Sequence, residues 1–276
     1  MNALEIRGLT KRRGDFALQG LDLTLPAGCI MGLIGENGAG KSTTIRLILN
    51  ALSRDGGTVA VYGKDNRALT PLEREDIGAV LDEVGLPEYM TARQIGCMMA
   101  GIFTCWQPEV YRDYLRRLAL PEDKPFRDFS RGMKMKQGLA VALSHQPKLL
   151  LLDEATSGLD PVVRDEILTI FADFTRDEEH AVLLSSHIVS DLEKICDYIA
   201  FLHKGRLLLC EEKDRLTEEY GILRGTTEGI EPAAVCGQRA TPYGTEYLVR
   251  RSAVPAGVPL GQVNIEDLFV FMAKEA

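Results

Sequence analysis

Residues 35–42 read GENGAGKS, which fits the pattern G-x-x-x-x-G-K-[ST]. This stretch follows an apolar run at residues 29–34 and precedes a segment with helical periodicity. Its glycines let backbone N–H groups converge on phosphate oxygens, which the N-terminal end of the next helix also attracts. It therefore predicts a loop that binds the phosphates of a nucleoside triphosphate. The expected phosphate-binding residues are Gly35, Glu36, Asn37, Gly38, Ala39, Gly40, Lys41, Ser42 and Thr43.

A second motif, Asp153 and Glu154, follows the apolar run at residues 149–152. Lys41 is expected to reach the β- and γ-phosphates, while the Ser42 hydroxyl and Asp153 are expected to hold Mg²⁺. Glu154 is then placed to polarise the attacking water. An acidic pair after a strand usually caps the next helix. Coupled with the phosphate loop, it predicts a hydrolysis site instead.

Short strand-like runs alternate with helical patterns through most of the chain, which is typical of an α/β layer fold with a largely parallel sheet. Residues 4–6, 21–23 and 58–62 have the alternation of strands. Residues 91–102 and 111–118 have apolar stripes typical of two helices, the first capped by Thr91, and we expect both stripes, Ile102 included, to be core. Beyond about residue 216, frequent Gly and Pro predict a small appended subdomain that ends in an amphipathic helix.

Composition narrows the class of protein. The chain has 276 residues, 45% of them hydrophobic, enough for one large domain or a domain with a small appendage. It contains no run of roughly 18–20 apolar residues that would cross a bilayer and no signal peptide, so we expect a cytoplasmic location. A net charge of −8 argues against nucleic acid as a partner. The six scattered cysteines favour reduced thiols.

Residues 1–215 resemble the nucleotide-binding subunits of ABC transporters, with every major motif in order. The resemblance implies an ABC-type ATPase domain with a mixed-sheet core, a helical subdomain at about residues 83–145, and a C-terminal α+β subdomain at residues 216–276. Residues 129–133, FSRGM, match the LSGGQ signature of that family. By that likeness, Ser130 and Gly132 cap the ATP held by the opposite subunit. Phe129, Arg131 and Met133 depart from the signature.

The resemblance assigns further site residues. Residues 157–160, SGLD, are similar to the D-loop that couples two ATP sites, so Asp160 is a predicted site residue. His187, after the run at residues 181–186, is similar to the family's switch histidine and is expected to contact the γ-phosphate. A lone histidine is more often structural than functional. Here its position after a predicted strand and downstream of Glu154 favours a functional role instead.

Two positions depart from the family more seriously. Asp82 occupies the place of a glutamine that touches Mg²⁺, and it retains a carboxylate suited to the metal. The aromatic residue that stacks on adenine in the family falls near Arg13, and the nearest aromatic is Phe16. Either the Arg13 guanidinium or the Phe16 ring provides that surface; Phe16 is slightly favoured.

The resemblance implies an ATPase that uses ATP and Mg²⁺ and drives a separate transmembrane permease, with residues 90–103 as the expected permease contact. The chain would pair with a second copy or a close homologue and lie on the inner face of the membrane. Its degenerate signature resembles that of bacterial exporters. A soluble ABC ATPase, such as one for iron–sulfur assembly, is the alternative. A nucleotide-gated binding module that does not turn over is disfavoured because Glu154 supplies a base.

Overall fold

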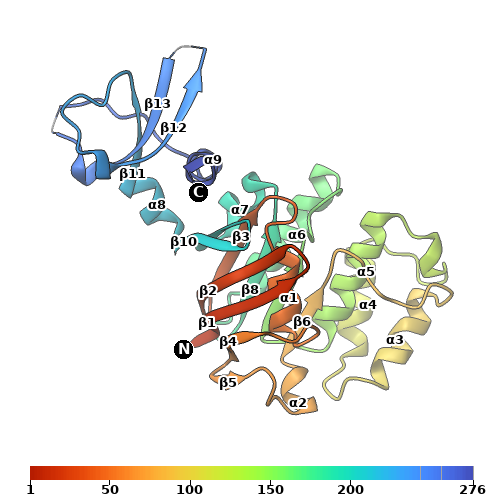
Figure 1. Cartoon of the computed structure of the whole chain (residues 1–276). Coiled ribbons are helices and arrows are strands. Elements are labelled where there is room, and N and C mark those ends of the chain that lie inside the picture. Colours follow the sequence, from red (N-terminus) through yellow and green to blue (C-terminus); the bar gives the residue numbers. More distant parts are fainter. Residues whose placement is uncertain (243, 256, 276) are drawn as a thin grey trace.

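The computed structural model describes residues 1–242, 244–255 and 257–275. Its central sheet is parallel except for one antiparallel edge strand (Figure 1). The expected α/β fold with a mixed-sheet core is therefore confirmed. The sheet strands lie in the order β10 (Arg206–Glu212), β9 (Tyr198–His203), β3 (Ile30–Gly35), β8 (Ala181–Ser186), β7 (Leu149–Asp153) and β6 (Ile77–Val80).

A second, antiparallel sheet covers the phosphate loop and its helix. Helix α1 (Lys41–Ile48) buries Ile45 and Leu47 in a core shared with this sheet. Tyr62, expected in a strand, lies instead in a turn with a φ of 46°, and its hydroxyl donates to Glu179 O at 2.7 Å. The sheet order is β2 (Phe16–Pro26), β1 (Asn2–Arg13), β4 (Gly56–Val61) and β5 (Lys64–Asp65).

A group of helices lies to one side of the sheets, beyond β6 (Figure 1). Thr91 caps α3 as predicted, accepting from Gln94 N at 3.3 Å. The prediction that Ile102 joins the buried stripe is wrong: α3 ends at Ala100, and Ile102 is 60% exposed. This group comprises α3 (Ala92–Ala100), α4 (Pro108–Arg117), the 3₁₀ turn η1 (Phe126–Asp128) and α5 (Arg131–Ser144). The short helix α2 (Pro71–Arg74), between β5 and β6 in the chain, lies below β6 in the view of Figure 1.

The last part of the described chain forms a three-stranded antiparallel sheet reached through α8 (Figure 1). The terminal helix α9 packs on this sheet and on the main body, where Phe269 lies 5.4 Å from Phe201 between ring centroids. The remaining elements are α6 (Pro161–Phe174), α7 (Val189–Ile195), α8 (Lys213–Glu219), β11 (Tyr220–Arg224), η2 (Pro232–Ala234), β12 (Val235–Thr241), β13 (Gly244–Arg250), η3 (Arg251–Ala253) and α9 (Ile265–Glu275).

The turn between β9 and β10 fastens the phosphate loop to β2. Gly205 N donates to Ala39 O at 3.0 Å, and Gln19 N donates to Gly205 O at 2.8 Å. Gly205 has a φ of 77°, and a Cβ there would lie 1.9 Å from Ala17 O. Glycine is therefore required by the backbone conformation and by the close approach of β2.

We predict that Gly205→Ala lowers the free energy of unfolding by about 3 kcal/mol or more, because strain and a backbone clash add. The matched control is Gly63→Ala, whose φ of 80° is similar but whose Cβ meets nothing within 4 Å. The control should lose only about 1–2 kcal/mol, the cost of the left-handed conformation. Urea unfolding followed by circular dichroism measures both, and equal losses would contradict the role of the β2 contact.

Candidate active site

The phosphate loop lies between β3 and α1, where the sequence predicted it. Lys41 opens α1 and turns its side chain back, so that Nζ donates to Gly35 O at 2.7 Å and to Glu36 O at 3.3 Å. Gly40 precedes the helix with a φ of 113°, and a Cβ there would lie 2.8 Å from Phe16 Cζ. The loop is thus shaped by a buried ammonium group inside it and an aromatic ring packed against it.

A cleft of about 360 Å³ opens over this loop. It brings the end of the β1–β2 hairpin, the start of α1 and the ends of β6 and β7 to one place. Gly35 and Ala39 are buried in the loop and do not line the cleft. The lining residues are Arg13, Phe16, Glu36, Asn37, Gly38, Gly40, Lys41, Ser42, Thr43, Asp82 and Glu154.

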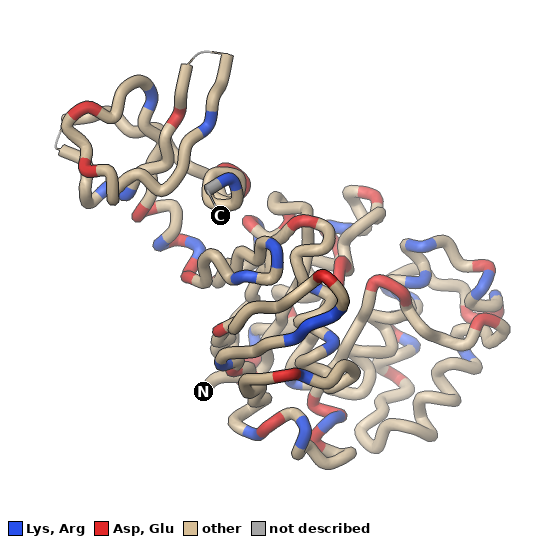
Figure 2. The backbone as a smooth tube through the Cα atoms, viewed as in Figure 1, with Lys and Arg blue, Asp and Glu red and all other residues tan. Residues whose placement is uncertain are grey.

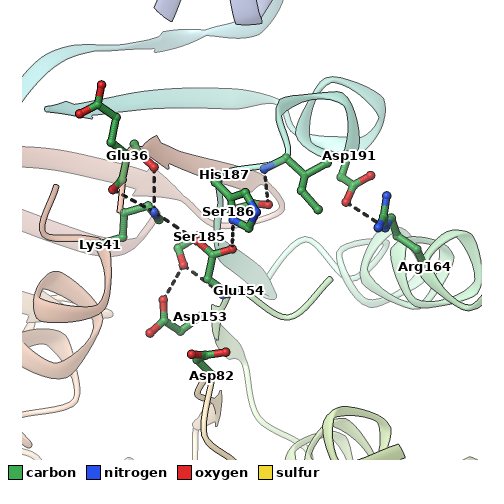
Figure 3. Close-up of polar contacts among 12 residues, drawn as sticks. Glu36, Lys41, Asp82, Asp153, Glu154, Arg164, Ser185, Ser186, His187 and Asp191 are labelled. Carbon is green, nitrogen blue, oxygen red and sulfur yellow. Dashed lines mark hydrogen bonds and ion pairs between the residues drawn. The ribbon is translucent and has the colours of Figure 1, made fainter. Parts of the chain in front are cut away.

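Glu154 lies between two basic groups on neighbouring segments (Figure 3). Its Oε1 is 3.2 Å from Lys41 Nζ, and its Oε2 is 2.6 Å from His187 Nδ1. Glu154 follows β7 in the left-handed region, with a φ of 54°, and its side chain is 14% exposed. The three residues predicted to be catalytic are therefore in contact, and their carboxylate faces the cleft.

Ser185, at the end of β8, positions the acidic pair. Its hydroxyl donates to Asp153 Oδ1 at 2.6 Å, and Glu154 N donates to Ser185 O at 3.1 Å. The sequence places this serine only in the run before His187 and predicts no role of its own for it. The available signal was its place at the end of a buried strand, because carboxyl ends of parallel strands share one edge of a sheet.

The oxygen donors around the cleft suit Mg²⁺ bound together with a nucleotide. Ser42 and Asp82 line the cleft, and Asp153 is buried beside Glu154. Within residues 1–242, 244–255 and 257–275, no group of three or more His, Cys, Asp or Glu is placed to hold a metal. Mg²⁺ commonly takes only one or two carboxylates and completes its shell with phosphates and water. The donor set fits that arrangement.

Asp153 and His187 do not line the cleft themselves but contact Ser185 and Glu154. Ser130, Gly132 and Asp160 do not line it either, and they lie at the starts of two helices. Ser130 caps α5, its hydroxyl accepting from Met133 N at 3.3 Å, and Gly132 lies in the first turn of that helix. Asp160 caps α6, its Oδ1 accepting from Val163 N at 3.1 Å. Within this chain they act as helix caps or helix starts, and their contact with ATP stays a prediction.

A strand, a phosphate loop and a helix, with an acidic pair at the end of β7, two strands away in the same sheet, define a nucleoside triphosphatase. Residues 18–157 match the profile of the family described as ABC transporter. The chain belongs to this family as an ATP-binding subunit and is an ATPase. Within the described residues, no helix is both long and apolar enough to span a membrane.

Relatives and solved structures agree with this assignment. The ABC transporter ATP-binding protein YtrB of Bacillus subtilis is 31% identical, over 79% of this chain and 74% of its own. The lantibiotic transport ATP-binding protein SrtF of Streptococcus pyogenes is 31% identical, over 76% of this chain and 91% of its own. A solved ATP-binding subunit of an ABC transporter has a TM-score of 0.72 and 26% identity, over 78% of this chain and 92% of its own.

We predict that Ser185→Ala lowers ATP hydrolysis about tenfold or more, because Asp153 loses the donor that orients its carboxylate; outer-shell partners of metal ligands commonly contribute this much. The control is Ser186→Ala, since the Ser186 hydroxyl accepts from Ile188 N at 2.9 Å and belongs to the backbone turn. Steady-state phosphate release measures both variants. Equal rates in the two would show that Ser185 has no special role.

Proposed function

We propose that this ATPase drives a separate membrane permease, and that two copies, or this chain and a close homologue, close around two Mg-ATP. The observation that carries the proposal is a cleft that contains Lys41, Glu154 and Asp82 while Ser130 lies elsewhere. Such a site exposes bound nucleotide to solvent on one side. A second chain that presents the start of its own α5 would complete it.

In the proposed reaction, Lys41 neutralises charge on the β- and γ-phosphates, and backbone N–H groups of the loop bind the remaining oxygens. Glu154 accepts the proton of the water that attacks the γ-phosphorus, and the bond to the bridging oxygen of ADP breaks. His187 holds Glu154 in place through the 2.6 Å contact. Mg²⁺, held by Ser42 with Asp153 and Asp82, would offset the charge of the phosphates.

Adenine is proposed to stack on Phe16. Arg13 and Phe16 are paired at the end of the β1–β2 hairpin, and both line the cleft. Phe16 is packed beside Gly40, so its ring is held next to the phosphate loop. Arg13 belongs to the short basic run at the end of β1 (Figure 2), formed with Lys11 and Arg12. Its guanidinium is then available for the ribose or the phosphates.

The permease contact is proposed at a mainly apolar groove of about 390 Å³ between the end of β6 and the helices beyond it. Ile102 projects there with 60% of its surface exposed, within the predicted contact at residues 90–103. An exposed large apolar side chain beside a groove is typical of a protein interface. The groove is lined by Ala79, Val80, Leu81, Glu83, Val84, Gly85, Leu86, Met99, Ile102, Phe103, Gly138 and Val141.

Export is the proposed direction of transport, because the degenerate signature at residues 129–133 resembles that of bacterial exporters. The proposed location is the inner face of the cell membrane, where the permease holds the chain. Residues 1–215 are the proposed ATPase domain, with its helical subdomain at about residues 83–145, and residues 216–276 are the proposed C-terminal subdomain. The packing of α9 against α7 would hold that subdomain on the ATPase domain.

We predict that Glu154→Gln abolishes most hydrolysis but keeps ATP affinity, because the amide cannot accept the proton, and that it accumulates closed dimers. Lys41→Ala should instead weaken ATP binding itself. Equilibrium binding of a fluorescent ATP analogue, phosphate release and size-exclusion chromatography separate the two defects. Wild-type hydrolysis by Glu154→Gln would show that another group is the base.

We predict that the tagged chain, extracted in detergent from its host, retains a multi-spanning protein in equal amount, and that Ile102→Asp loses it while hydrolysis by the free chain persists. The control is Leu72→Asp, on α2, where the side chain is 59% exposed and lies outside the groove. Quantitative mass spectrometry gives the ratio of the multi-spanning protein to the tagged chain. Recovery of no membrane protein with the wild type would favour the soluble ABC ATPase.

A further inference from the structure

An ion pair joins the end of β6 to the start of α5. Arg131 Nη2 lies 2.6 Å from Asp82 Oδ1, and the two side chains are 59% and 50% exposed. Arg131 also passes next to the turn after Glu154, since a Cβ on Gly158 would lie 3.7 Å from Arg131 Cδ. Both residues depart from the family pattern, and here the two departures contact each other.

The position of Arg131 explains why it needs a partner from outside its helix. Arg131 is the first residue of the 14-residue helix α5, where the helix dipole is positive, and the first turn of α5 contains no acidic residue. A guanidinium there is disfavoured unless a carboxylate offsets it. Asp82 supplies that carboxylate, 49 residues earlier in the chain.

Asp82 is also a candidate metal ligand. It lines the phosphate cleft together with Ser42, and it lines the neighbouring cleft together with Arg131. In the structure its Oδ1 faces Arg131. A small dication requires close, well-aligned oxygen ligands, so a carboxylate drawn toward a guanidinium is less available to it. The Asp82 carboxylate can therefore pair with either of two cations, the Arg131 guanidinium or the metal ion.

We propose that Asp82 exchanges partners, binding Arg131 before nucleotide arrives and Mg²⁺ afterwards. Arg131 is then a positioning residue that competes with the metal, and metal binding releases the tie between β6 and α5. Release frees the start of α5, which carries Ser130 and Gly132, to move toward a second chain. This proposal deepens the proposed function and rests on the Mg-ATP site described above.

The test measures Mn²⁺ affinity of the chain bound to a non-hydrolysable ATP analogue, by electron paramagnetic resonance with the chain in excess over nucleotide. Arg131→Gln should bind Mn²⁺ about two- to fivefold more tightly than wild type, the size of an exposed ion pair. Asp82→Asn should bind it more weakly. Adding Arg131→Gln to Asp82→Asn should then have little further effect, because the shared carboxylate is gone.

Arg127→Gln is the control, because Arg127 is 52% exposed, lies four residues before Arg131, and pairs with Asp128. It should leave Mn²⁺ affinity unchanged. An unchanged or lower Mn²⁺ affinity in Arg131→Gln would overturn the proposed exchange. It would also be overturned if Arg131→Gln raised Mn²⁺ affinity equally in a chain that already carries Asp82→Asn. If the wild type bound nucleotide as tightly in EDTA as in Mn²⁺, that result would contradict the metal site of the proposed function as well.

Discussion

The arrangement depends on one buried ammonium group. Lys41 Nζ lies within reach of Gly35 O, Glu36 O and Glu154 Oε1, with only 6% of its side chain exposed. A buried charge is costly unless it is paired and hydrogen-bonded. The loop carbonyls and the Glu154 carboxylate offset that cost in the structure, and in the proposed site the phosphates of ATP would become further partners of the ammonium group. The group that stabilises the loop is thus the one proposed to bind the substrate.

The sheet brings the chemical groups to this lysine. Strands β3, β7 and β8 run parallel, so the loop after β3, the acidic pair at the end of β7, and Ser185 with His187 at the end of β8 meet at one edge. The antiparallel sheet adds Phe16 from the other side of the loop. Segments that are far apart in the sequence therefore form one cleft, because parallel strands end together.

Much of this site was predictable from sequence, because its residues are local motifs that follow buried strands. The strands themselves were recognisable as continuous apolar runs, and Thr91 marked the start of α3. Tyr62 and Ile102 were misassigned, since a turn and a helix end depend on backbone conformations that apolar spacing does not encode. Ser185 and the Asp82–Arg131 pair are tertiary contacts across 32 and 49 residues. No periodicity in the sequence marks such pairs.

The most direct test of the proposed two-chain site is a cross-link between copies. Asn37 is exposed in the phosphate loop and Ser130 is exposed at the start of α5. In a chain that carries both Asn37→Cys and Ser130→Cys, we expect Mg-ATP to promote a disulfide between two copies. Chains that carry only one of the two substitutions show how much cross-linking comes from the native cysteines. Tight ATP binding without this disulfide would contradict a site completed by a second copy of this chain.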